Sequence, residues 1–170
     1  LASAAQAQDL PLAPLDNFGK VAIPATQSAG GRFIVEQAFG GSFDAEPAAR
    51  YPESSVMRQQ GRAVGRLDVA YAQGVGYCTA FLISEQYLMT NAHCLESGQV
   101  QAIKFVAGYV ETGVEEGTRT YTVGTRPVEI SPSDDLDFAI LQVFGDPAAE
   151  WGTVELAARK IDPDRDAGMP

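Results

Sequence analysis

The sequence is short of cysteine, histidine and positive charge. Its 170 residues include two cysteines and one histidine, and 12 basic residues stand against 22 acidic ones. The net charge of −10 argues against a nucleic acid or an anionic membrane as partner, because phosphates would be repelled. No apolar run reaches the roughly eighteen residues of a membrane-spanning helix. With 45% hydrophobic and 20% charged residues, the composition is that of a globular chain of about one domain.

The first 55 residues carry no sustained periodic pattern. Ala5-Gln6-Ala7 has the small-x-small form of a signal-peptidase site, which predicts a signal-peptide remnant over 1–7, although an ordinary Ala-rich tail fits equally well. Residues 8–55 are rich in Ala, Gly, Pro, Gln and Ser and are interpreted as a leader, a propeptide or an extended arm, with one short strand over 32–37. Export would fit an oxidised cysteine pair, so we expect a secreted or periplasmic protein.

From residue 63 the sequence changes to short apolar runs separated by Gly, Pro and Asp. The runs contain β-branched or aromatic residues and end near turn signals, which is typical of an all-β barrel or sandwich. Strands are predicted over 63–71, 76–83, 87–92, 102–110, 118–130 and 137–143. A single helical turn is predicted over 94–99. The pattern fades after Trp151, and 161–170 are interpreted as the start of a linker.

Both cysteines and the histidine lie within CTAFLISEQYLMTNAHCL, which runs from Cys78 to Leu95. His93 could be a core residue, a metal ligand or a general base. A closed zinc site needs four ligands, so one histidine with two cysteines is too few, and we expect neither a metal nor a cofactor. A Cys78–Cys94 disulfide would be worth roughly 3 kcal/mol and would hold the backbone of His93 in place. The alternative is a pair of reduced core cysteines.

The segment TNAHC, residues 90–94, resembles the histidine box of chymotrypsin-like serine endopeptidases, usually Thr-Ala-Ala-His-Cys. CTAFLIS resembles the strand before that box, with the partner cysteine at the family's separation. The bacterial secreted trypsin-like and glutamyl-endopeptidase-like branches look nearest, although Asn91 and Ala80 depart from the usual pattern. The resemblance implies an antiparallel Greek-key β-barrel over 56–160, the first of the two barrels of the chymotrypsin-like fold, with His93 as its catalytic base.

The family's next element is an acid in the form Asp-apolar-Ala-apolar-Leu, and DFAIL at 137–141 matches it. The resemblance therefore makes Asp137 the carboxylate that orients His93 and stabilises the imidazolium formed when the base takes up a proton. Asp134 and Asp135 are rivals, but they lie in the polar turn SPSDD, whereas Asp137 opens an apolar run.

The nucleophilic serine of the family has no counterpart in this sequence. The family places that serine after the aspartate, in a Gly-Asp-Ser-Gly or Gly-Asn-Ser-Gly loop of a second barrel that also supplies the oxyanion hole. Every serine here precedes Asp137, and Ser42 in GGSF lies before His93 and lacks the following glycine. We therefore expect a fragment of a secreted serine endopeptidase, inactive alone, with a C-terminal barrel and a peptide or protein substrate as partners. The alternative is a non-enzymatic binding or scaffold protein built on a protease-like barrel.

The sequence also makes geometric predictions. Asp137 Oδ should lie about 2.6–3.2 Å from His93 Nδ1. That pair should face solvent, with exposed apolar surface where a second barrel would dock. Activation by cleavage after Arg32 or Arg50 is not assigned, because Arg32 lies far from Cys78 and Arg50 is followed by Tyr51-Pro52.

Overall fold

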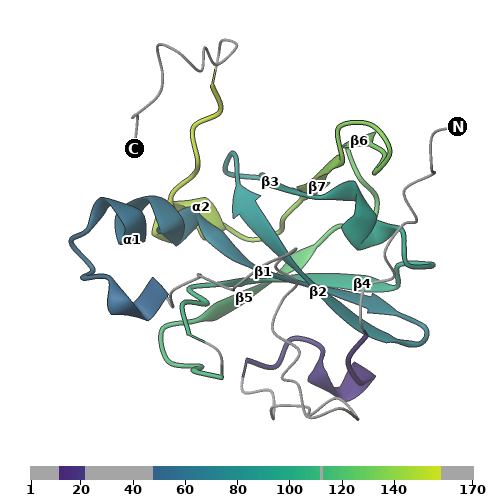
Figure 1. Ribbon diagram of the computed structural model, residues 1–170, viewed down its shortest axis with the longest axis horizontal. Coiled ribbons are helices and arrows are strands. Elements are labelled where there is room, and N and C mark those ends of the chain that lie inside the picture. Colours follow the sequence, from purple (N-terminus) through teal and green to yellow (C-terminus); the bar gives the residue numbers. More distant parts are fainter. Residues whose placement is uncertain (1–11, 22–47, 112, 158–170) are drawn as a thin grey trace, which may run out of the picture.

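The computed structural model describes residues 12–21, 48–111 and 113–157 (Figure 1). Its seven strands form one sheet in the order β5-β4-β1-β2-β3-β7-β6, and every pairing is antiparallel. The strands are β1 (Val64–Tyr71), β2 (Gly74–Leu82), β3 (Tyr87–Thr90), β4 (Ala102–Ala107), β5 (Arg119–Val123), β6 (Glu129–Ser131) and β7 (Phe138–Gln142). The spatial order β4-β1-β2-β3 is that of a Greek key, because the fourth strand returns beside the first.

The sheet closes on itself at the ends of β5 and β7. Val123 forms an antiparallel bridge with Val143. Beside it, Gly124 N donates to Gln142 O at 2.8 Å and Phe144 N donates to Thr122 O at 2.9 Å. This closure removes the free edge that β5 would otherwise present. The expected all-β fold, an antiparallel Greek-key barrel, is confirmed.

Two local predictions were wrong. The run 118–130 is not one strand but two, β5 and β6, separated by 124–128. Pro127 lies in this gap and has no N–H to donate to a ladder. The two strands also need different partners, since β5 pairs with β4 whereas β6 pairs with β7. The helical turn predicted over 94–99 is instead the 3-10 turn η4 (Ala92–Leu95), so His93 lies within it.

Short helices flank the barrel where no helix was predicted. They are η1 (Leu15–Asn17), η2 (Ala48–Arg50), α1 (Val56–Gln60), η3 (Gly61–Ala63) and α2 (Pro147–Trp151). Ser55 Oγ accepts from Arg58 N at 3.2 Å at the start of α1, and Asp146 Oδ1 accepts from Ala149 N at 3.3 Å at the start of α2. Both are ordinary N-caps. The helices are too short for a sequence period to reveal them.

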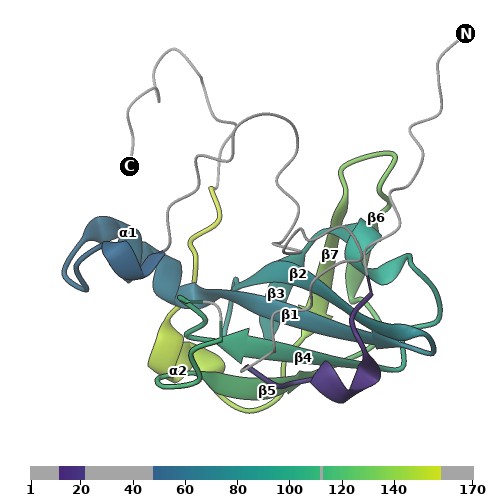
Figure 2. The ribbon, with the colours of Figure 1, turned by 60° about the horizontal axis from the view of Figure 1, so that its bottom comes forward.

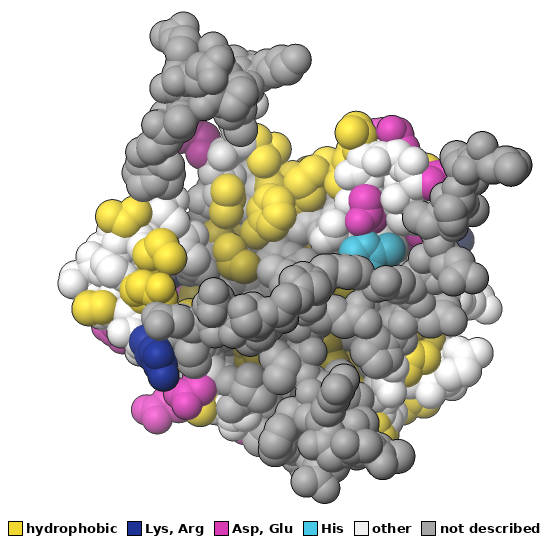
Figure 3. Space-filling view, viewed as in Figure 1, with side chains coloured by type: hydrophobic (Ala, Val, Ile, Leu, Met, Phe, Trp, Pro, Cys, Tyr) yellow, Lys and Arg dark blue, Asp and Glu magenta, His cyan; other side chains and the backbone are white. Residues whose placement is uncertain are grey.

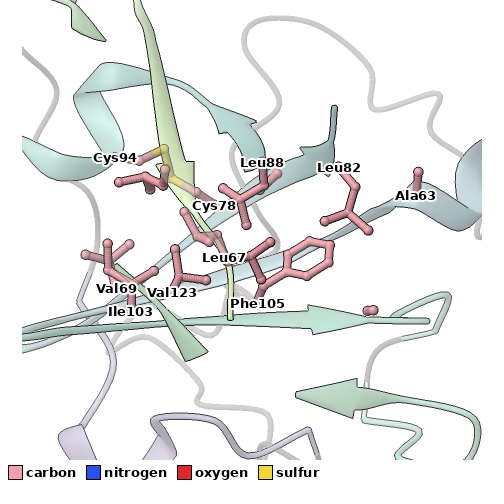
Figure 4. Close-up of a cluster of buried hydrophobic side chains, with 14 of the residues drawn as sticks. Ala63, Leu67, Val69, Cys78, Leu82, Leu88, Cys94, Ile103, Phe105 and Val123 are labelled. Atoms are coloured by element: carbon pink, nitrogen blue, oxygen red, sulfur yellow. A yellow bond between two sulfur atoms is a disulfide. The ribbon is translucent and has the colours of Figure 1, made fainter. Parts of the chain in front are cut away.

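The core fills the barrel with alternate residues of the strands, as the two-residue period of a strand requires (Figure 4). From β1 it takes Leu67, Val69 and Tyr71, all fully buried. The other strands add apolar side chains to the same cluster: Cys78, Ala80, Leu82, Leu88, Ile103, Phe105, Ala107, Val123 and Leu141.

The outward face of β1 is also buried, because residues 12–21 lie across it. Ala13 and Val75 exchange two backbone hydrogen bonds of 2.8 Å. Gly74 permits this approach, since a Cβ there would meet Ala13 O at 2.5 Å. Figure 2 shows η1 beside β4, where Lys104 Nζ lies 4.8 Å from the centre of the Phe18 ring. We call residues 12–21 the N-terminal arm.

The N-terminal arm covers an ion pair on β1. Arg66 Nε donates to Asp68 Oδ1 at 2.7 Å, and the side chains are 2% and 0% exposed. The arm contributes two backbone groups, Gly19 N donating to Asp68 Oδ2 at 2.9 Å and Lys20 O accepting from Arg66 Nη2 at 2.8 Å. Tyr77 and Tyr109 lie with their ring centres 4.8 and 4.6 Å from the guanidinium carbon of Arg66. Both charges are thus paired, as buried charges must be.

Several predictions fall outside the described residues: the signal-peptide remnant over 1–7, the strand over 32–37 and the linker over 161–170. Arg32 and Ser42 lie outside them too. Within the described ranges, every helix is too short or too polar to cross a membrane.

Candidate active site

His93 lies in the turn that follows β3. Thr90 ends the strand, with its Oγ1 donating to Thr79 O on β2 at 2.8 Å. Asn91 is extended, with φ −76° and ψ 146°, and the chain then enters η4. Ala92 is fully buried and anchors this turn to the barrel. The small residue before the histidine thus lets the chain turn tightly against the core while the imidazole points outward.

The predicted disulfide is present and fixes the backbone beside His93. Cys78 on β2 is bonded to Cys94 in η4, with Cα atoms 6.3 Å apart. The Tyr71 hydroxyl donates to the carbonyl of Cys94, so a second contact holds the same residue. The donor atoms of Cys78, His93 and Cys94 lie within 4.8 Å of one another. They do not form a metal site, because both sulfurs are used in the disulfide.

Asp137 precedes β7 and has an uncommon backbone conformation. Its φ of +50° is the left-handed region, which aspartate tolerates better than most side chains. The preceding loop supports this conformation, with Asp137 N donating to Pro132 O at 3.1 Å and Leu136 N donating to Ser131 Oγ at 3.1 Å. The positive φ of Asp137 changes the direction in which its own side chain leaves the backbone. Here the carboxylate turns toward His93.

Both carboxylate oxygens of Asp137 form hydrogen bonds with His93. His93 Nδ1 lies 2.8 Å from Oδ2, and the backbone N–H of His93 donates to Oδ1 at 3.0 Å. The side-chain amide of Asn91 donates to Oδ2 at 3.1 Å. Burial raises the pKa of Asp137, but the hydrogen bonds from His93 and Asn91 and the charge of His93 outweigh it and hold that pKa below its usual value.

The two side chains meet at the distance predicted from the sequence, on a face open to solvent. The side chain of His93 is 40% exposed and that of Asp137 is 27% exposed. An ionised carboxylate only accepts hydrogen bonds, so Nδ1 carries the ring proton of neutral His93 and Nε2 has a free lone pair. Figure 3 shows the histidine at the surface with hydrophobic side chains gathered on the same face. Leu136, next to Asp137, is 72% exposed.

The rival acids and the serines lie elsewhere. Asp135 Oδ2 accepts from Ser131 Oγ at 2.9 Å and Asp134 is exposed, so neither contacts His93. In the described ranges no serine hydroxyl forms a hydrogen bond with the imidazole. Sequence reasoning missed two links between the residues that flank η4 and the loop before β7. These are the contacts of Asn91 with Asp137 and the bond from Ser133 Oγ to Glu96 Oε2 at 2.6 Å. The departure of Asn91 from the usual box was the one available signal.

Comparison with known proteins gives two kinds of match. A sequence model of the family described as "Trypsin-like peptidase domain" matches residues 78–167. Among solved structures, one described as "Structure of GrC" is similar with 18% identity and a TM-score of 0.45, over 62% of this chain and 49% of that one. The thermostable serine protease AL20 from an extremophilic microorganism shows 20% identity and a TM-score of 0.40, over 56% and 46%.

The structure of HL collagenase shows 20% identity and a TM-score of 0.36, over 48% of this chain and 36% of that one. The chain thus spans less than half the length of each of these three structures. No curated protein sequence is significantly similar to it.

Proposed function

Since the chain belongs to the trypsin-like peptidase family, we propose that it supplies the histidine and the aspartate of a serine endopeptidase. The observation that carries the proposal is the contact of His93 Nδ1 with Asp137 Oδ2 at 2.8 Å, on an exposed face. His93 is the general base and then the general acid, and Asp137 is the carboxylate that orients it. The substrate is a peptide or a protein.

The reaction needs a base whose free nitrogen faces the nucleophile. With Nδ1–H held by Asp137, Nε2 can accept the proton of a serine hydroxyl as that oxygen attacks the peptide carbonyl. The imidazolium formed in this step lies against the ionised carboxylate, which stabilises its charge. Nε2 then returns the proton to the leaving amine. The low pKa of Asp137 keeps the carboxylate ionised throughout, so that it continues to act as an acceptor.

We propose that the serine and the oxyanion hole come from a second barrel, in a longer form of the same chain or in a separate chain. Two observations support this partner. In the described residues no serine hydroxyl reaches His93, and the family's serine motif is missing from the sequence. The face that bears His93 also exposes hydrophobic side chains, as a surface covered by another barrel would (Figure 3).

We further propose that the protein is exported, to the cell exterior or to the periplasm, as in the bacterial secreted members of the family. The disulfide between Cys78 and Cys94 supports this, because such bonds persist in oxidising compartments and are rare in the cytosol.

The test uses the whole natural protein, including any sequence that follows Pro170 and any chain that copurifies with it. A fluorophosphonate probe, which reacts with an activated serine, should label it, and it should hydrolyse casein. Asp137→Asn should lower kcat/KM by a factor of about 10⁴ through kcat, with KM unchanged. The matched control is Asp134→Asn, which removes an exposed acid of the same loop and should retain full activity.

His93→Ala should abolish labelling by the probe. A whole protein that neither reacts with the probe nor cleaves casein would instead support a non-enzymatic protein built on a protease-like barrel. Full activity in His93→Ala would contradict the assignment of the base.

A further inference from the structure

Asn91 departs from the usual histidine box, and the structure shows it in contact with the candidate acid. We propose that Asn91 is a positioning residue for Asp137, whose carboxylate it holds in the orientation that receives the Nδ1–H of His93. The catalytic meaning of this role rests on the proposed function of the His93–Asp137 pair. The positioning itself does not, and can be measured separately.

The side-chain amide of Asn91 contacts Asp137 at two points. Nδ2 donates to the backbone oxygen of Asp137 at 3.2 Å and to its Oδ2 at 3.1 Å. One contact restrains the main chain and the other restrains the carboxylate, so together they limit rotation of the side chain between them. Alanine, the residue usual at this place in the resembling box, could make neither contact. The substitution therefore adds an interaction that the pattern alone does not provide.

The left-handed backbone conformation of Asp137 is one that the contacts of Asn91 stabilise. A residue with φ of +50° is held there by its surroundings and not by its own preference. The bond from Asn91 to the backbone oxygen of Asp137 opposes its return to an ordinary conformation. The bond to Oδ2 shares that oxygen with His93 Nδ1, which keeps it turned toward the imidazole.

The other charged groups near Asp137 do not compete for its carboxylate. Glu96, the residue that follows η4, accepts two hydrogen bonds from Ser133. In the loop before β7, Asp135 is occupied by Ser131, and Asp134 is exposed. Glu129 on β6 and Tyr87 on β3 pair with Ile140 and Gln142, farther along β7. His93 is therefore the titratable side chain that contacts Asp137.

The contact between Glu96 and Ser133 provides a matched control. Ser133 donates to Glu96 through Oγ at 2.6 Å and through N at 3.3 Å. It joins the same two segments as Asn91 and Asp137 do, but it does not reach the carboxylate. Ser133→Ala thus weakens the link between the segments and leaves the contact of Asn91 with Asp137 in place.

The experiment is NMR of the full 170-residue chain, with pH titration of the Asp137 carboxyl carbon and measurement of the exchange of His93 Nδ1–H with water. Asn91→Ala should raise the pKa of Asp137 toward the ordinary aspartate value, because a donor to the ionised form is lost. Exchange of Nδ1–H should become faster by roughly threefold or more, the factor of a weak hydrogen bond. Ser133→Ala should change neither.

Asn91→Asp keeps the shape of the side chain and places a carboxylate against Asp137, so it should raise the pKa of Asp137 further than Asn91→Ala does. It also serves as the test if Asn91→Ala fails to fold. Unchanged titration and exchange in both Asn91 variants would overturn the proposal, as would an equal change in Ser133→Ala. Neither readout needs peptidase activity, so failure here is distinct from failure of the proposed function, which the probe and casein assays report.

Discussion

The barrel carries two aspartates that are each paired with a basic side chain, and their surroundings are opposite. Arg66 and Asp68 are 2% and 0% exposed, and the N-terminal arm covers them. His93 and Asp137 are 40% and 27% exposed on another part of the barrel. In the covered pair every charge faces a fixed protein group. In the open pair the ring nitrogen that does not face the aspartate makes no hydrogen bond with another described residue.

The difference separates a pair that holds the fold together from one that is open to solvent and to which we assign a catalytic role. The guanidinium of Arg66 does not lose its proton near neutral pH, so it cannot act as a base. The covered pair therefore serves packing and the position of the N-terminal arm. An imidazole ring can accept a proton and return it, and the pKa of the partner Asp137 is held below the ordinary aspartate value. The same residue type, aspartate, thus takes a structural and a proposed catalytic role according to its partner and its exposure.

The largest expected effect comes from removing one charge of the covered pair. Asp68→Asn leaves Arg66 buried without a counter-charge, which should lower the free energy of unfolding by about 3–5 kcal/mol. Asp137→Asn on the open pair should lower it by less than about 1 kcal/mol, because exposed pairs contribute little and asparagine accepts a positive φ. Urea unfolding of both variants measures the contrast. Equal losses in the two variants would contradict the comparison.

The disulfide supports the open pair and not the covered one. Replacing Cys78 and Cys94 by alanine should lower the free energy of unfolding by roughly 3 kcal/mol, as expected for a loop of this length. In the folded double variant, hydrogen exchange should accelerate at His93 N, which lies beside Cys94. The amide of Gly19, which donates to Asp68, should become no less protected than the lower global stability of the variant requires. Faster exchange at both positions would show that the two regions are not independent.

The sequence predicted the open pair far better than the covered one. A short, specific box and a matching DFAIL segment identified His93 and Asp137, because the residue types are dictated by the chemistry. Nothing local marks Arg66 and Asp68 as buried, since they alternate with Leu67 and Val69 as outward residues of a half-exposed strand would. Their burial depends on the N-terminal arm, whose sequence LAPLDNFGKV has no period to reveal that it lies across β1.

For the strands, too, features set by the local sequence were predicted better than features set by tertiary neighbours. Ends set by local turn signals, as at Tyr71 and Gly74, were close to the predicted bounds. The division of 118–130 into β5 and β6 was missed because it follows from which strands are neighbours in the closed barrel. The hydrogen bonds of Asn91 to Asp137 join residues 46 positions apart and were equally beyond the reach of a local pattern.

Acid titration should affect the open pair with a definite sign. The folded-state pKa of Asp137 is below its ordinary value, so ionised Asp137 stabilises the fold above the pKa of the unfolded state, and this contribution is lost as pH falls through the folded-state pKa. The difference in unfolding free energy between the wild type and Asp137→Asn should therefore shrink as the pH is lowered from the unfolded-state pKa of Asp137 through its folded-state pKa. A difference that grows on acidification would contradict the direction of the shift.

The smallest effect is expected at Tyr77, beside the covered pair. Burial, with the nearby charge of Asp68, raises the pKa of Tyr77 to about 12, above the ordinary tyrosine value of about 10. A raised tyrosine pKa stabilises the fold fully below the unfolded-state pKa, and this is lost as pH rises toward 12. The hydroxyl of Tyr77 has no hydrogen-bond partner among the described residues, so Tyr77→Phe should be nearly neutral at pH 7 and should reduce the loss of stability above pH 10.

We propose that the open pair performs chemistry, whereas the covered pair holds structure. The most direct measurement determines, in the whole natural protein, both kcat/KM on a peptide substrate and the urea midpoint for Asp137→Asn and Asp68→Asn. Asp137→Asn should lose about 10⁴-fold in kcat/KM at nearly unchanged stability. Asp68→Asn should lose stability, yet its folded fraction should keep the wild-type kcat/KM. Wild-type kcat/KM in Asp137→Asn would contradict the catalytic role proposed for the open pair.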